Sequence, residues 1–129
     1  MVIKDLLRLI FPDYCIHCGT PLVGSEKHLC TQCLIEIPWS RHAQFSDNDA
    51  ELRLAGHIPC QAAATLITFQ KGNVAQSIVH HIKYYGYISL GIQYGKLLGQ
   101  ELKDSGRFNN IDYIVPVPLH WFKKIRRGY

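Results

Sequence analysis

The sequence contains no long run of apolar residues. A helix that crosses a bilayer needs roughly 20 such residues in succession, and no segment of the 129-residue chain reaches that length. The opening MVIKDLLRLIFP is interrupted by Lys4, Asp5 and Arg8, and no small-residue cleavage site follows it. It is therefore not typical of a secretory signal, and its spacing indicates a short amphipathic helix instead. We expect a cytoplasmic protein without a membrane span.

The chain also lacks a strong charge imbalance, an internal repeat and a low-complexity tract. Its hydrophobic share of 47% and its charged share of 19% are typical of a globular protein rather than a disordered one. A formal net charge of +4 does not by itself identify a nucleic-acid partner. Basic side chains nevertheless gather near the C-terminal end, at Lys123, Lys124, Arg126 and Arg127. They are candidates for contacts with nucleic-acid phosphates, and a solvated helix face is the alternative.

The sequence has five cysteines, and the spacing of four of them is specific. Two Cys-x-x-Cys pairs occur in CIHCGTPLVGSEKHLCTQC, at Cys15, Cys18, Cys30 and Cys33. Two such pairs supply the four thiolates of a structural zinc site, which has no open coordination position for catalysis. Disulfides and a thioredoxin-like redox pair are the alternatives; reduced cytosolic thiols disfavour the first, and the missing strand-helix context disfavours the second. The fifth cysteine, Cys60, is expected to be a buried apolar residue.

Beyond the cysteines, the sequence shows short apolar runs and helical periodicity. Residues 40–56 are polar and lack sustained periodicity, which predicts a linker. The runs AAATLITF at 62–69 and DYIVPV at 112–117 predict buried strands, and residues 74–83 and 90–103 predict helices. Strand, helices and strand in this order indicate the first part of an α/β sheet. The expected division is 1–39 for the N-terminal helix and zinc module, 40–56 for the linker and 57–129 for the α/β part.

A stiff Pro-x-Pro turn follows the second predicted strand. Ligands of α/β sheets bind at the carboxyl ends of the strands, and here Pro116, Val117, Pro118 and Leu119 lead directly into the basic segment. A rigid backbone beside cations suits a phosphate or pyrophosphate group. A simple chain reversal is the alternative.

Several of these motifs together resemble one family. The stretches LIFPDYCIHCG, CTQC, GHIPCQAAATLITFQKGNVAQSIVHHIKYYGYISLGIQYGKLLG and DYIVPVPLHWFKKIRRGY are similar to those of the ComF family of bacterial phosphoribosyltransferase-like proteins. The resemblance implies a zinc ribbon followed by a type I phosphoribosyltransferase fold with a Rossmann-like sheet. In competent bacteria it further implies a role in DNA uptake with a helicase partner. Single-stranded DNA is a candidate ligand of the basic C-terminal residues.

The resemblance also assigns residues to a pyrophosphate site. Lys83, Tyr84 and Gly86 match the family's Lys-Tyr-x-Gly loop beside the active-site cleft. The stretch from Pro116 to Leu119 matches the pyrophosphate loop, and Arg127 belongs to the Arg-Arg-Gly that follows. The four cysteines match the ribbon ligands of structural Zn²⁺.

One expected element of that family is missing. The sequence has no pair of adjacent aspartates followed by the Thr/Gly-rich loop that holds the ribose 5-phosphate of phosphoribosyl pyrophosphate. We therefore expect the chain to be truncated, with phosphoribosyl pyrophosphate and Mg²⁺ bound only by a full-length parent. Catalytic residues are unknown, and this chain alone is expected to be inactive. The alternative is a non-catalytic zinc-ribbon factor that binds nucleic acid or a partner protein.

Overall fold

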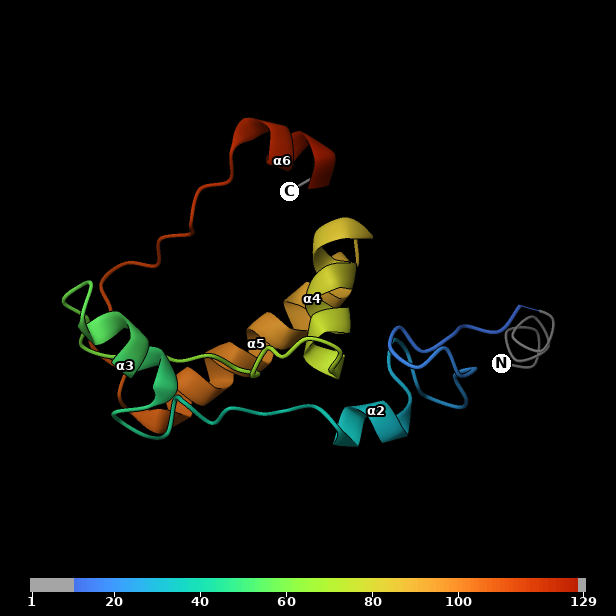
Figure 1. The fold of residues 1–129 in the computed structure, drawn as a ribbon, viewed down its shortest axis with the longest axis horizontal. Helices are drawn as coiled ribbons and strands as arrows, with labels where there is room; N and C mark the ends of the chain where they lie inside the picture. Colours follow the sequence, from blue (N-terminus) through green and yellow to red (C-terminus); the bar gives the residue numbers. More distant parts are fainter. Residues whose placement is uncertain (1–10, 128–129) are drawn as a thin grey trace.

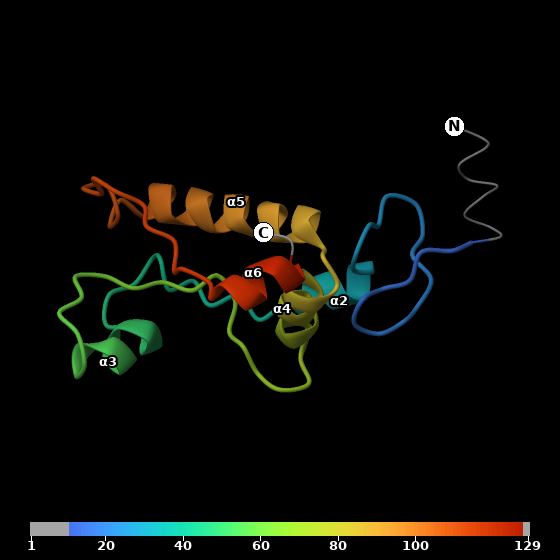
Figure 2. The ribbon, with the colours of Figure 1, turned by 90° about the horizontal axis from the view of Figure 1, so that it is seen from above.

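The structure, a computed structural model, describes residues 11–127 and is elongated (Figures 1 and 2). Its helices are α2 (Thr31–Ile35), α3 (Asp49–Ala55), α4 (Val74–Tyr84), α5 (Ile88–Ser105) and α6 (Trp121–Arg127). The cysteine-rich loops lie at one end, α3 lies at the other, and α4 and α5 lie between them (Figure 1). The helix expected near the N-terminus falls outside the described residues. Within residues 11–127, no helix combines the length and apolarity that a membrane span requires.

The predicted α/β sheet is wrong, because residues 11–127 contain no strand. The run at 62–69 makes a single antiparallel bridge, between Trp39 and Ile67. Several of its other carbonyls accept hydrogen bonds from side chains, including that of Ala63 from Asn48 and that of Thr68 from Asn73. Side-chain donors thus replace the neighbouring strand that a sheet would need.

The second predicted strand, at 112–117, is also wrong. It is an extended segment without strand partners in the described chain, and Ile114 is 93% exposed. Pro116 interrupts the row of backbone donors, so this stretch cannot form a continuous ladder. The apolar, β-branched residues favour extended backbone, which the segment adopts. A β-strand also needs a neighbouring strand to pair with, and the described residues supply none.

The two predicted helices are confirmed as α4 and α5. Helix α4 begins at Val74, and the side chain of its N-cap residue Asn73 accepts a hydrogen bond from the amide of Gln76. The helix buries Ile78 to 1% exposure. Helix α5 ends at Ser105 and is capped by Gly106, which has a φ of +69°, a conformation that favours glycine. The two helices pack closely, since a β-carbon at Gly91 would lie 3.4 Å from Ile82.

One hydrophobic core joins the cysteine-rich end to the two long helices. Its buried members come from the cysteine loops, from the segment before α4 and from both helices: Cys15, Leu29, Cys33, Ile37, Leu66, Val74, Ile78, Leu90 and Tyr94. Trp39 stacks on Tyr94 with ring centroids 6.2 Å apart. The division of the chain at residues 39 and 56 stays a prediction, but the cysteine-rich end shares its core with α4 and α5.

The polar segment expected to be a linker contains α3 and is held by a network of hydrogen bonds. Asn48 caps α3 and donates to the carbonyls of His42 and Phe45. Arg107, just after α5, donates to the same two carbonyls and forms an ion pair with Glu51. The hydrogen bond from Arg107 holds the pKa of Glu51 far below its ordinary value, at about 2.

Candidate metal centre and cationic pocket

The first cysteine pair lies on a tight turn. The amide of Cys15 donates to the carbonyl of Thr20 at 2.8 Å, and the amide of Gly19 donates back to the carbonyl of Cys15 at 3.0 Å. Gly19 has a φ of +72°, which a residue with a side chain adopts only with strain. The turn reverses the chain directly after Cys18 and thereby brings the sulfurs of Cys15 and Cys18 to the same side.

The second pair is positioned by the start of a helix. Cys30 is the N-cap residue of α2, and Cys33 lies in its first turn. Residues three apart lie on one side of a helix, so both sulfurs can point to a common centre. Glu26 fixes the approach to this helix, because its carboxylate accepts hydrogen bonds from the amides of Val23 and Thr31.

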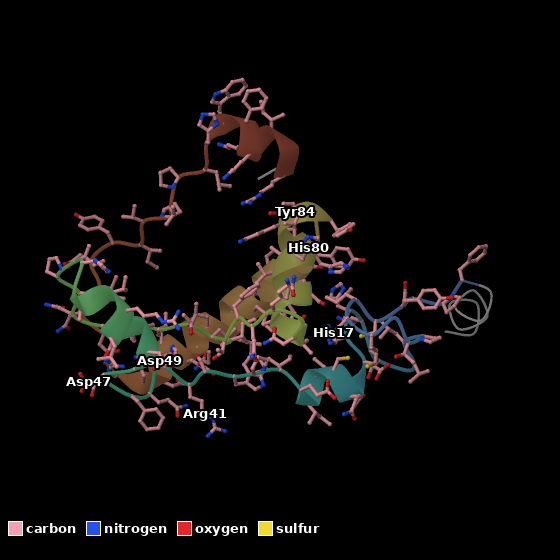
Figure 3. The ribbon with its side chains drawn as sticks, in the orientation of Figure 1. His17, Arg41, Asp47, Asp49, His80 and Tyr84 are labelled. Atoms are coloured by element: carbon pink, nitrogen blue, oxygen red, sulfur yellow. The ribbon has the colours of Figure 1, made fainter. Side chains whose placement is uncertain are left out.

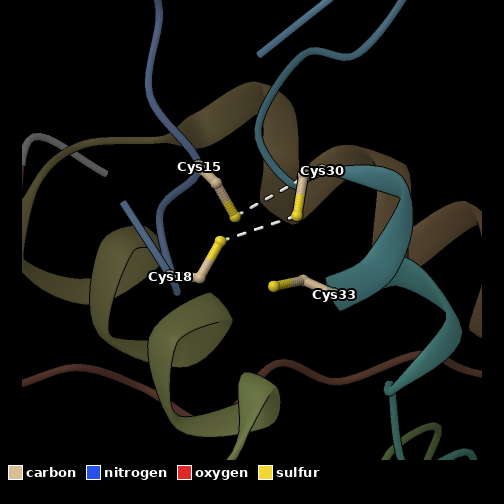
Figure 4. A group of neighbouring side chains, drawn as sticks. All are labelled: Cys15, Cys18, Cys30 and Cys33. Carbon is tan, nitrogen blue, oxygen red and sulfur yellow. Dashed lines mark hydrogen bonds between the residues drawn. The ribbon is translucent and has the colours of Figure 1, made fainter. Parts of the chain in front are cut away.

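The four sulfur atoms converge in the structure (Figure 4). They all lie within 4.8 Å of one another, and those of Cys18 and Cys30 are 3.6 Å apart. A tetrahedral zinc ion with sulfurs at ~2.3 Å would place them about 3.8 Å apart. The geometry and the donor set therefore fit a structural zinc ion, which would crosslink the two loops when bound.

The surroundings give the thiols different acidities. Hydrogen bonding with Thr20, whose hydroxyl oxygen lies 2.6 Å from the sulfur, lowers the pKa of Cys18 to about 6. Burial raises the pKa of Cys33, whose side chain lies in the hydrophobic core. Cys18 is thus predisposed to bind as a thiolate, and a cation held by the other sulfurs would favour loss of the proton from Cys33.

Comparison with known families agrees with this geometry. Residues 6–44 match the family model described as a double zinc ribbon domain, and the match covers less than a third of the chain. No curated protein and no solved structure matches the chain. The predicted zinc ribbon is therefore confirmed, with its four cysteines positioned to bind zinc.

The fifth cysteine, Cys60, takes no part in this site. It is exposed rather than buried as expected, and its thiol donates to the carbonyl of Ala62.

A second feature combines residues from the two sets of predicted phosphate contacts. A pocket of about 210 Å³ is lined by Lys83, Tyr84, Lys123 and Arg127. The first two come from the C-terminal end of α4 and the last two from α6, which lies next to that end (Figures 1 and 2). Three cations thus share one concave site.

Other predicted site residues do not line this pocket. The stretch from Pro116 to Leu119 lies in the exposed extended segment, and Leu119 is 37% exposed. Gly86 follows α4 in the loop to α5, with a φ of +71°, and Lys124 is exposed on α6. Arg126 belongs to α6 by its backbone. The structure therefore brings together only part of the pyrophosphate set.

A row of aromatic rings was missed by sequence reasoning. It runs along α4 and the following loop through His80, His81, Tyr84, Tyr85 and Tyr87, with contacts that continue to His28 in the cysteine-rich end. The density of His and Tyr in VHHIKYYGY was the available signal. His17, beside the first cysteine pair, contacts the hydroxyl of Ser77 on α4 at 2.9 Å and further connects the ribbon to this helix.

Proposed function

We propose that this chain is a non-catalytic, zinc-stabilised factor that binds the phosphates of nucleic acid. The observation that carries the proposal is the pocket between α4 and α6, which three cations line. None of Lys83, Lys123 and Arg127 forms an ion pair with a carboxylate of residues 11–127. Their charges are therefore available for an anionic ligand, and phosphate groups match the combination of lysine point charges and a guanidinium.

The zinc site supports a structural role in this proposal. Four thiolates complete the tetrahedral coordination of zinc, so the metal would have no open position for substrate or water. Its contribution would be to hold the loops that pack against α4, the helix that carries Lys83. The metal would thereby fix one wall of the cationic pocket without taking part in chemistry.

A finer form of the proposal is membership of the ComF family with a role in DNA uptake beside a helicase. The motifs quoted from the sequence support it.

The position of Lys83 beside Arg127 also favours a second candidate ligand, free pyrophosphate. Against it stands the stretch from Pro116 to Leu119, which lies outside the pocket. Calorimetric titration with pyrophosphate tests this candidate, and binding weaker than that of an oligonucleotide would discard it.

Fluorescence anisotropy with a labelled 15-nucleotide single strand tests the main proposal. Affinity should fall steeply with salt, because each phosphate contact releases counterions. Replacing Lys83, Lys123 and Arg127 together by Ala should reduce the slope of log affinity against log salt by roughly 2, at about 0.7 per lost contact on a single strand.

The matched control removes three exposed lysines outside the pocket. The variant carrying Lys71→Ala, Lys96→Ala and Lys103→Ala has the same net charge as the pocket variant. It should keep most of the salt slope, because under this proposal these lysines do not contact the bound phosphates. Long-range attraction changes equally in both variants, so it would not explain a difference between their slopes. Equal slopes for the two triple variants would contradict the proposed pocket, and a salt-independent affinity would contradict phosphate binding altogether.

A further inference from the structure

We infer that the aromatic row beside the cationic pocket is a stacking platform for unpaired nucleobases, which makes single-stranded nucleic acid the ligand. The inference rests on the proposed function and names its substrate class. Successive ring centroids are 5.2 Å apart for Tyr87 and His81, 4.9 Å for His81 and Tyr85, 5.7 Å for Tyr85 and His80, and 4.7 Å for His80 and Tyr84. The rings therefore form a continuous series.

The row ends at the cationic pocket. Tyr84 both contacts His80 and lines the pocket with Lys83. Figure 3 shows His80 and Tyr84 at the end of α4 that faces α6, and His17 toward the opposite end of the same helix. A strand whose phosphates lie in the pocket would therefore carry its next bases past the tyrosine rings.

The tyrosines at this end are open to solvent. Tyr84 is 54% exposed and Tyr85 is 63% exposed, whereas a ring that only fills the core is largely buried, as Tyr94 is at 8%. Exposed aromatic rings beside cations are the combination that binds single strands, because each base can stack while each phosphate is neutralised. The bases of a duplex are already stacked on each other and cannot reach such rings.

An abasic oligonucleotide separates stacking from phosphate binding. It keeps the phosphates of a 15-nucleotide deoxythymidine strand and removes its bases. Anisotropy should show the thymidine strand binding more tightly, by roughly 5- to 150-fold if one base stacks. A 15-base-pair duplex should bind more weakly than the single strand. A uridine strand of the same length distinguishes RNA from DNA as the source of the bases, and tight binding of either supports the platform.

Variants locate the platform on the chain. The double change Tyr84→Leu and Tyr85→Leu should bring thymidine binding down to near the abasic level. The single change Tyr85→Leu, at a ring that does not line the pocket, should weaken thymidine binding and leave abasic binding unchanged. Tryptophan at both positions, Tyr84→Trp with Tyr85→Trp, should instead keep thymidine binding tight, because indole also stacks on bases. Tyr113→Leu is the matched control: Tyr113 is 86% exposed in the extended segment, and its loss should change neither affinity. Far-UV circular dichroism checks that the variants fold.

The failures of the two proposals are distinguishable. If no oligonucleotide binds, the proposed function is wrong. Salt-dependent binding that is equal for the thymidine and abasic strands would keep phosphate binding and overturn the platform. Binding that is tighter for the duplex would overturn it as well. The comparison of strands uses the unaltered protein, so it decides the question even if the double tyrosine variant does not fold.

Discussion

Replacing Ile78 by Ala should weaken zinc binding, although Ile78 contacts no metal. Ile78 lies on α4, is 1% exposed and belongs to the same core as Cys15 and Cys33. The change removes three carbons, which are worth about 2.4 kcal/mol at ~0.8 kcal/mol each. The cavity left behind raises the expected loss of stability to about 3–4 kcal/mol.

This loss should appear in the apparent zinc affinity. Small zinc modules take most of their folding free energy from the metal, so destabilising the core that the ligands share reduces the net binding free energy. At 1.4 kcal/mol for each factor of ten, a loss of about 3–4 kcal/mol corresponds to roughly 100- to 700-fold weaker binding. Competition with a colorimetric zinc chelator, under reducing conditions, measures this ratio.

Ile92→Ala is the matched control for this prediction. It makes the same chemical change on α5, at a side chain that is 55% exposed, and should shift zinc affinity by no more than about twofold. An Ile78→Ala protein that folds and binds zinc as tightly as the unaltered chain would refute the reasoning. The ribbon would then fold independently of α4, despite the core they share.

Two further predictions concern the metal ligands and the pH dependence of stability. The purified protein should contain one zinc ion per chain, as measured by elemental analysis. The double change Cys15→Ser and Cys30→Ser should abolish this zinc content, and an unaltered chain that contains no zinc under reducing conditions would contradict the assignment. Glu51, whose pKa is lowered from 4.5 to about 2, should add stability above about pH 5 that is lost as the pH falls toward 2. The difference in urea unfolding between the unaltered protein and Glu51→Gln should therefore shrink over this interval, and a difference that stays constant with pH would contradict it.

Local patterns predicted the parts of this molecule that local interactions determine. The spacing of Cys15, Cys18, Cys30 and Cys33 sets the metal-binding geometry through one tight turn and the start of α2, and the period of the apolar residues sets α4. The predicted sheet depended on pairing between distant segments, which composition cannot specify. The run at 62–69 instead pairs briefly with the chain after α2.

The residues that line the cationic pocket were predicted as phosphate contacts, but the sequence did not show that they meet in one site. Sequence placed Lys83 in one candidate set and Lys123 in another, while Arg127 belonged to both. Their meeting depends on how the extended segment carries α6 back to the end of α4 (Figure 1). Periodicity contains no information about that path, so the sequence could not show that Pro116 would lie outside the site.

The contact made by Arg107 has a consequence for the order of folding. One guanidinium holds the carbonyls of His42 and Phe45 and the carboxylate of Glu51, and these partners lie 56 to 65 residues earlier in the chain. A loop of that length closes only at an entropic cost, so we expect α3 to dock after α5 has formed. Amide hydrogens of α3 should then exchange faster than those of α4. Lysine could not replace this residue, because its single ammonium lacks the planar fork that reaches three acceptors at once.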